Sequence, residues 1–223
     1  MGDTDLAALG RLLADSSRAT MCTVMLDGRF HTAGELARAA EVAPSTASEH
    51  LTRLVSGGLV EGDRQGRHRY YRLAGADVAA ALESLALVAP ERAVTGLRSS
   101  SASAALRRGR TCYDHLAGEL GVRLTDALIR RNVITDEFAL ADAAPLRELG
   151  VAVPAPADGA SRRPLVRGCV DWTERRHHAA GVVPAALATR LFDLGWVARV
   201  GSGRAVRLTG AGEAGLVGAL GSL

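Results

Sequence analysis

The chain has 223 residues, of which 48% are hydrophobic, and its formal net charge is +3. This length and composition allow a core for one large or two small domains. No apolar run reaches the roughly 18 to 20 residues that cross a bilayer, and the first residues lack the basic-then-apolar order of a signal peptide. We therefore expect a globular cytoplasmic protein that has no membrane partner.

The cysteine content argues against a disulfide framework. Cys22, Cys112 and Cys169 form an odd and sparse set, which is typical of reduced thiols. Cys22 lies in an apolar helical stretch, so we interpret it as a core residue. Any chemical role for the other two is then metal ligation or redox sensing.

The first 90 residues carry the signals of four short helices. Thr32 and Glu35 form a Thr-x-x-Glu capping box, and Pro44 suits the first position of the next helix. Gly57 and Gly58 stop that helix. The spacing of apolar residues predicts helices at 5–13, 16–26, 33–40 and 44–56.

A hairpin and a further helix follow. Leu59 to Glu61 and Tyr70 to Leu73 are strand candidates on either side of a polar turn at 64–67, and 77–88 has the spacing of a helix. Two short helices, a hairpin rich in arginine and a following helix describe a winged helix-turn-helix. We assign this domain to residues 1–90.

The second helix of the predicted helix-turn-helix has one apolar and one polar face. A helix in this position places its early polar side chains in the major groove of B-DNA. A solvated helix face is the alternative for such a helix taken alone. With the flanking elements present, we predict DNA contacts by Ser45, Thr46, Ser48, Glu49, His50 and Arg53.

The hairpin tip is strongly basic. Its side chains are suited to neutralising phosphates or entering the minor groove. A merely soluble loop would have the same composition, so the prediction depends on the neighbouring helices. The predicted contacts are Arg64, Arg67, His68 and Arg69.

An internal repeat marks residues 106–223. The sequence from Asp114 to Gly118 recurs from His177 to Gly181, and each copy is preceded by Cys-x-Asp, at Cys112 and Cys169. A proline-rich stretch separates the copies. We predict two similar helix-hairpin units, 106–151 and 165–223, packed as a pseudo-twofold pair after a linker or helix start at 91–105. The fold class is α+β and mainly helical.

An ordered series of short matches over residues 5–88 resembles the ArsR/SmtB family of bacterial repressors. The series includes Ala14-Asp-Ser-Ser-Arg-Ala19, Ser45-Thr-Ala-Ser-Glu-His-Leu51 and Gly66-Arg-His-Arg-Tyr-Tyr-Arg-Leu73. The resemblance implies a winged-helix homodimer held by the first and last helices of the domain. It also implies that Ser45, Thr46, Ser48, His50 and the hairpin arginines touch DNA.

The sequence departs from the metal-sensing members of that family in two places. His31-Thr-Ala-Gly34 stands where thiophilic-metal sensors carry paired cysteines, and 77–88 contains no histidine for a site on the last helix. A standard metal site of the family is therefore not expected.

The C-terminal repeat offers another ligand set. Thiolate and imidazole are preferred ligands of zinc and related ions, and Cys112, His115, Cys169 and His178 can converge across the pseudo-twofold. The alternative is that both cysteines are small buried hydrophobes at equivalent helix positions. Further ligand candidates are Asp114, Asp171 and Trp172, with Arg175 and Arg176 for an anion.

These features favour a homodimeric repressor of operator DNA, released by a metal ion or small molecule bound in the C-terminal domain. Two alternatives remain open: an architectural DNA-binding dimer without a ligand, and an enzyme with a cysteine nucleophile. The sequence has no phosphate-binding glycine loop, no Gly-x-Ser-x-Gly and no His-Glu-x-x-His. We therefore do not expect an enzyme, and no cofactor is assigned with certainty.

Overall fold

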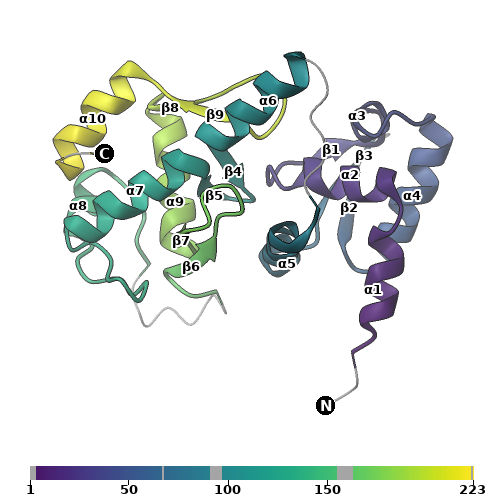
Figure 1. Cartoon of the computed structure of the whole chain (residues 1–223), viewed down its shortest axis with the longest axis horizontal. Helices are drawn as coiled ribbons and strands as arrows, with labels where there is room; N and C mark the ends of the chain where they lie inside the picture. The colour runs from purple at the N-terminus through teal and green to yellow at the C-terminus, as the bar shows by residue number, and fades with distance from the viewer. Residues whose placement is uncertain (1–3, 67, 91–96, 155–162, 222) are drawn as a thin grey trace. The chain divides into compact units, whose positions relative to one another are not determined.

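The computed structural model describes residues 4–66, 68–90, 97–154, 163–221 and 223. The chain divides into two compact units, residues 1–82 and 83–223, so the division falls within the helix α5 (Ala76–Val88). The sequence analysis predicted this domain boundary at residue 90. Of the predicted linker, 91–96 lie outside the described residues and 97–105 are helical (Figure 1).

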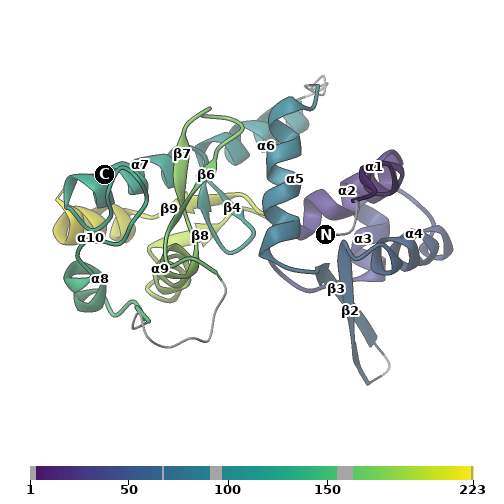
Figure 2. The ribbon, with the colours of Figure 1, turned by 90° about the horizontal axis from the view of Figure 1, so that it is seen from below.

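The N-terminal unit is a winged helix-turn-helix, as predicted. A three-stranded antiparallel sheet of order β1-β3-β2 closes it, and the β2–β3 hairpin extends away from the helices (Figure 2). Its elements are α1 (Leu6–Leu13), α2 (Ser16–Met25), β1 (His31–Thr32), α3 (Ala33–Ala39), α4 (Pro44–Ser56), β2 (Val60–Gln65) and β3 (His68–Leu73), followed by α5.

Local sequence signals set the ends of these helices. Asp15 caps α2 by accepting from two backbone N–H groups, and both halves of the Thr32–Glu35 capping box are formed at α3. The first helical position of α4 is Pro44, and the preceding Ala43 makes no side-chain cap. Capping therefore fixes where α2 and α3 begin, while proline alone marks the start of α4.

The buried side chain of Arg18 holds three helices of this unit together. Its guanidinium donates to the carbonyls of Arg11 and Leu12 at the end of α1, at 2.8 and 2.6 Å. A third nitrogen lies 3.3 Å from Nδ1 of His50 in α4. Satisfying the last carbonyls of one helix with a side chain of the next fixes how α1, α2 and α4 meet.

The C-terminal unit contains the repeat, and each copy begins with a short hairpin followed by a long helix. Its mixture of helices and two-stranded sheets confirms the α+β, mainly helical class. The elements are α6 (Leu97–Arg108), β4 (Arg110–Cys112), β5 (His115–Ala117), α7 (Gly118–Arg130), α8 (Ala144–Glu148), β6 (Arg167–Val170), β7 (His177–Ala180), α9 (Val182–Asp193), β8 (Val197–Arg199), β9 (Val206–Leu208) and α10 (Gly210–Leu220).

The elements within a copy differ in part from the predicted helix-hairpin unit. The cysteines lie on strands β4 and β6, not at helix positions, in a hairpin that precedes the helix of its copy. In the second copy a further hairpin, β8–β9, follows the helix α9, as expected for a helix-hairpin unit. Strands of three or four residues are too short for an alternating pattern to be recognised in the sequence. In the first copy, the segment after α7 forms one isolated bridge between Ile134 and Leu140.

A glycine ends each hairpin and starts each helix. Gly118 and Gly181 both have positive φ, 73° and 112°, and a Cβ there would lie 2.6 and 2.7 Å from the backbone oxygens of Arg107 and Pro164. Only glycine fits such a close approach with that backbone conformation. The repeated glycine of the sequence therefore reflects a repeated sharp turn.

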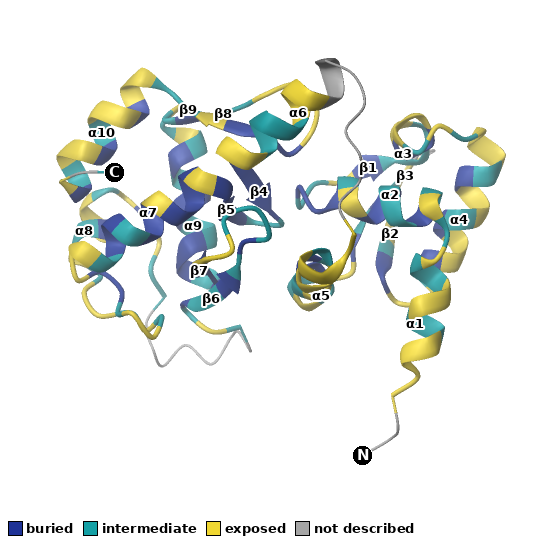
Figure 3. Ribbon diagram, viewed as in Figure 1, coloured by how far each residue is buried: buried dark blue, intermediate teal, exposed yellow. Residues whose placement is uncertain are grey.

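One hydrophobic core joins the two copies. Leu120, Leu124 and Leu128 of α7 pack in the same buried cluster as Leu187 and Leu191 of α9. The β4–β5 hairpin and strand β7 lie beside it and are largely buried themselves (Figure 3). Among the described helices, none is long and apolar enough to cross a membrane.

Candidate nucleic-acid interface and cysteine-histidine cluster

The outward face of α4 presents the polar residues predicted to read DNA. Leu51, Leu54 and Ala47 are fully buried beneath it. Ser48 hydrogen-bonds back to the carbonyl of Pro44 at 2.9 Å, which leaves its oxygen lone pairs directed outward. The exposed residues are Ser45, Ser48, Glu49 and Arg53, and Thr46 is half-buried.

His50 departs from the predicted outward orientation. Its side chain is only 13% exposed and lies 3.8 Å from Asp15 as well as against Arg18. Its ring therefore packs α4 onto α2. This contact explains, in structural terms, why an arginine and a histidine occur in those two places.

The hairpin carries its arginines on an exposed surface. Arg64 and Arg69 face each other across the β2–β3 ladder, and Arg69 stacks on Tyr71 with its guanidinium 5.3 Å from the ring centre. A Cβ on Gly62 would lie 2.8 Å from Arg69, so the glycine makes room for that side chain. Arg67 and the side chain of His68 lie outside the described residues.

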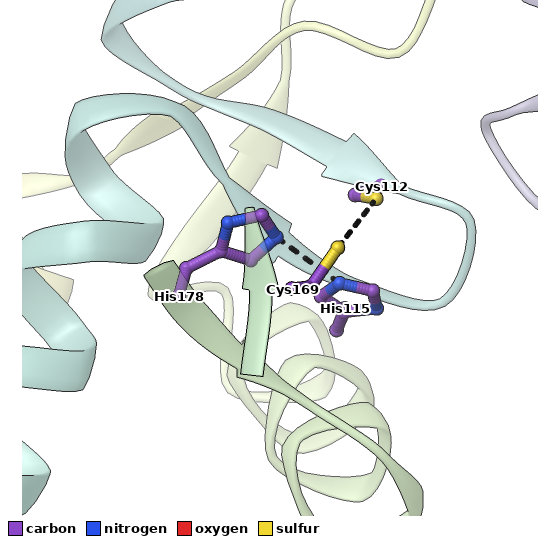
Figure 4. Close-up of side chains that lie close together, drawn as sticks. All are labelled: Cys112, His115, Cys169 and His178. Carbon is purple, nitrogen blue, oxygen red and sulfur yellow. Dashed lines mark hydrogen bonds between the residues drawn. The ribbon is translucent and has the colours of Figure 1, made fainter. Parts of the chain in front are cut away.

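The two hairpins of the C-terminal unit bring Cys112, His115, Cys169 and His178 together. Cys112 lies directly opposite His115 in the β4–β5 register, and Cys169 lies directly opposite His178 in β6–β7. Residues opposite each other in an antiparallel pair project from the same face. Each copy of the repeat therefore supplies one thiol and one imidazole to a common point (Figure 4).

The cluster is compact and buried. The two sulfur atoms are 4.0 Å apart, the two histidine Nε2 atoms are 3.1 Å apart, and one donor atom from each of the four residues lies within 4.8 Å of the others. Exposed fractions range from 1% for Cys112 and His178 to 7% for Cys169. All four are potential metal ligands, and water has little access to them.

Each histidine faces the aspartate of its own Cys-x-Asp motif through its other ring nitrogen. His115 Nδ1 lies 3.2 Å from Asp114, and His178 Nδ1 lies 3.6 Å from Asp171. Burial opposes protonation of His115, but Asp114 and Cys169 outweigh it and raise its pKa. In both copies, therefore, the imidazole lies between an aspartate carboxylate and the centre of the cluster.

The two thiols are electrostatically unequal. The hydrogen bond from Cys112 is the main cause that lowers the pKa of Cys169, and contacts with His115 and His178 add to it against the effect of burial. The same bond, with burial, raises the pKa of Cys112. Cys169 is therefore the more acidic of the two thiols.

Comparisons with known proteins show which proteins this chain is similar to. Residues 13–63 match the family model described as Helix-turn-helix domain. The chain is 37% identical over 212 residues to YdfF of Bacillus subtilis (strain 168), an uncharacterized HTH-type transcriptional regulator, covering 94% of each protein. It is 39% identical over 88 residues to the HTH-type transcriptional regulator CmtR of Mycobacterium tuberculosis (strain ATCC 25618 / H37Rv), covering 40% of this chain and 74% of that one.

Among solved structures, one neighbour is the homodimeric winged helix-turn-helix DNA-binding domain, fragment 1–100, of a possible ArsR-family regulator from Mycobacterium bovis. It is 33% identical, with a TM-score of 0.35, over 40% of this chain and 88% of that one. The match to YdfF over nearly the whole chain and the match to CmtR over 74% of its length decide the family. The chain belongs to the ArsR/SmtB family of winged helix-turn-helix transcriptional regulators. It is a regulator and not an enzyme.

The regulator uses other side chains where the metal-sensing members of its family carry ligands. His31, on β1 just before α3, places Nε2 2.8 Å from the buried carboxylate of Asp27. Asp27 also accepts from Arg29 at 2.7 Å. Together these contacts make a local ion-pair network that holds the α2–β1 turn.

The remaining ligand candidates are engaged within the regulator. Asp171 accepts from the buried Arg110 at 3.0 Å and from the Gly118 N–H at 2.7 Å. Trp172 stacks on Arg110, 4.7 Å from its guanidinium. Arg176 forms a two-point pair with Asp126 at 2.8 and 3.1 Å, and Arg175 occupies an exposed turn with positive φ.

Sequence reasoning missed the most buried cation of the unit. Arg110 is fully buried and connects α6, the second Cys-x-Asp motif and Thr173. Its sequence neighbourhood, Arg-Thr-Cys, looks like an ordinary polar run. The position two residues before Cys112 is the signal that could have found it, because Arg167 stands two residues before Cys169 in the other copy.

Proposed function

We propose that this regulator is a homodimeric repressor that binds operator DNA through α4 and the β2–β3 hairpin and is released by an effector bound in its C-terminal unit. The observation that carries the proposal is the exposed polar face of α4 together with the β2–β3 hairpin, in which Arg64 lies directly opposite Arg69. The proposed contacts are Ser45, Thr46, Ser48, Glu49, Arg53, Arg64, Arg67, His68 and Arg69.

Exposed apolar side chains support self-association. Leu6 of α1 is 74% exposed, and Leu85 and Val88 of α5 are 44% and 80% exposed. These are the first and last helices of the winged-helix domain, which the family resemblance assigns to the dimer interface. Burying them against a second copy removes apolar surface from water.

A repressor of this kind acts on chromosomal DNA, so we propose a cytoplasmic location. The effector must bind the DNA-free form more tightly than the DNA-bound form, because linkage is reciprocal. An effector without that difference in affinity could not release the operator.

Footprinting on the promoter regions nearest the regulator's own gene tests the DNA role. A symmetric dimer should protect an imperfect inverted repeat whose half-sites lie on one face of the duplex, one helical turn or a multiple apart. Sedimentation at micromolar concentration should give a dimer. A monomer, or protection of a single unrepeated site, would contradict the proposal.

A further inference from the structure

Two edges of the cysteine-histidine cluster match those of a tetrahedron around a metal ion. With Zn–S near 2.3 Å and Zn–N near 2.0 to 2.1 Å, a tetrahedral site has ligand separations of about 3.8 Å for two sulfurs and about 3.3 Å for two nitrogens. The observed separations are 4.0 and 3.1 Å. All four donor atoms lie within 4.8 Å of one another, against about 3.5 Å for a sulfur–nitrogen edge, so binding draws the donors together by up to about 1 Å.

The facing histidines can each offer a ring nitrogen to an ion. His115 Nδ1 lies 3.2 Å from Asp114, and this contact favours the proton on Nδ1 and leaves Nε2 as an acceptor. His178 Nδ1 lies 3.6 Å from Asp171 and makes no hydrogen bond within the described part of the chain. The two Nε2 atoms lie 3.1 Å apart inside the protein, close enough for one ion to bind both.

The donor set selects the class of ion. Two sulfur and two imidazole ligands suit zinc and other thiophilic ions, whereas magnesium and calcium require oxygen ligands. The nearest carboxylates are engaged elsewhere, Asp114 by Arg163 at 2.7 Å and Asp171 by Arg110. These two carboxylates therefore do not provide oxygen ligands at the centre of the cluster.

We infer that Cys112, His115, Cys169 and His178 bind one thiophilic divalent ion per chain, such as Zn²⁺, and that this ion is the effector of the repressor. Binding forms two metal–sulfur and two metal–nitrogen bonds. Any proton on either sulfur or on either Nε2 leaves to solvent as the metal bonds form. The assignment as effector rests on the proposed function, but the metal site itself does not.

The ion would join the two copies of the repeat and reach the helix α5. Each copy contributes one cysteine and one histidine, so binding fixes the β4–β5 hairpin against β6–β7. Beside Cys112, the Thr111 N–H donates to the carbonyl of Arg204, whose guanidinium pairs with the buried Glu83 of α5. Movement of β4 is thereby conveyed to the helix that the family resemblance assigns to dimerisation.

Cobalt titration of the reduced, metal-free full-length protein tests the site. One Co²⁺ per chain should produce the visible bands of tetrahedral coordination and a thiolate-to-cobalt charge-transfer band, and one equivalent of Zn²⁺ should remove both. Cys112→Ser and His178→Gln should lose the spectrum. Cys22→Ala should keep it, because Cys22 is an equally buried cysteine outside the cluster.

Wild-type protein alone gives a check that does not depend on folded variants. Zn²⁺ should protect two of the three cysteines from a thiol reagent under mildly denaturing conditions. A reduced wild-type protein that takes up no Co²⁺ or Zn²⁺, or that gives an octahedral spectrum, would overturn the site. So would a Cys112→Ser variant that folds and retains the wild-type spectrum.

Operator affinity with and without Zn²⁺ tests the effector role separately. We expect binding to weaken by about 5- to 150-fold in wild type and Cys22→Ala, and to stay unchanged in His178→Gln. Stoichiometric metal binding with unaltered operator affinity would overturn the effector assignment. Absence of operator binding in both states would instead contradict the proposed DNA function and leave the spectroscopic result standing.

Discussion

At the scale of single residues, Asp171 has the most consequential position in the C-terminal unit. It is fully buried and accepts from Arg110, from the Gly118 N–H and from Thr173. Burial raises its pKa, but the Arg110 charge and these hydrogen bonds outweigh burial and lower it. One carboxylate thereby contacts the start of α7, the buried guanidinium of Arg110 and Nδ1 of His178.

Replacing this carboxylate should cost far more stability than breaking a surface pair. Asp171→Asn leaves the Arg110 guanidinium buried without a counter-charge, which typically costs about 3 to 5 kcal/mol. Asp126→Asn breaks only the pair with Arg176, whose side chains are 32% and 59% exposed, and should cost about 1 kcal/mol or less. Urea unfolding followed by tryptophan fluorescence measures both, since Trp172 and Trp196 lie in this unit. Equal losses would refute the assigned role of Asp171.

The spacing of the repeat made the cluster residues candidates, but it could not supply their contacts. Cys112, His115 and their counterparts stand out because a thiol and an imidazole recur in the same order. That His50 packs onto Arg18, and that Arg110 reaches Asp171, depends on contacts 32 and 61 residues apart in the chain. Such pairings follow from the folded topology, which a single sequence does not specify.

At the scale of elements, the hairpin arginines should act on DNA through charge alone. If Arg64 and Arg69 contact phosphates, Arg64→Ala and Arg69→Ala should weaken binding to operator and unrelated DNA alike. Each should also lower the slope of log K against log salt by about one unit. Fluorescence anisotropy across a salt series measures both quantities.

Arg72→Ala provides the matched control for the hairpin. It removes the same charge from the same hairpin, but Arg72 is already paired with Glu61 and stacks on Phe30, 4.5 Å from the ring centre. We expect its salt slope to remain close to wild type. If all three variants give the same slope, net charge rather than the hairpin tip governs binding, and the hairpin is not part of the interface.

Elements with strong local signals were predicted, and those without them were not. The capping box before α3, Pro44 at α4 and the leucine spacing of α1 reproduce their bounds to within a residue or so. The β4–β5 and β6–β7 hairpins escaped detection because each strand has three or four residues and Tyr113, in the β4–β5 turn, takes a positive φ of 60° without being glycine or asparagine. Tertiary packing, not local preference, stabilises them.

At the scale of the whole molecule, the two units share a dependence on ionised carboxylates. In each case burial raises the pKa of the carboxyl, but hydrogen bonds and nearby positive charges outweigh burial, and the net result is a pKa below the ordinary value. The carboxylates concerned are Asp15, Asp27 and Glu35 in the N-terminal unit and Asp114 and Asp171 in the C-terminal unit. A group whose pKa is lower in the folded state stabilises the fold above its unfolded pKa.

Acid should therefore unfold the molecule through these groups. Their contribution is complete above the ordinary aspartate and glutamate values of 3.8 and 4.5 and is lost as pH falls through the lowered folded values. Stability should be nearly constant between about pH 5 and 7 and then fall steeply. Asp27 is the best single test. Burial raises its pKa, but the contacts with His31 and Arg29 lower it by more than burial raises it.

Asp27→Asn should remove one part of this acid dependence while lowering stability at neutral pH. The variant loses the ion pairs to His31 and Arg29, so amide exchange in α2 and α3 should be faster than in wild type near pH 6. As pH falls below 3.8, wild type loses the same interactions by protonation, and the difference in opening free energy should shrink toward zero. Asp193→Asn, which changes the net charge equally at an exposed position, should show no such convergence. A difference that stays constant from about pH 6 to pH 3 would mean that Asp27 does not stabilise the fold through its charge.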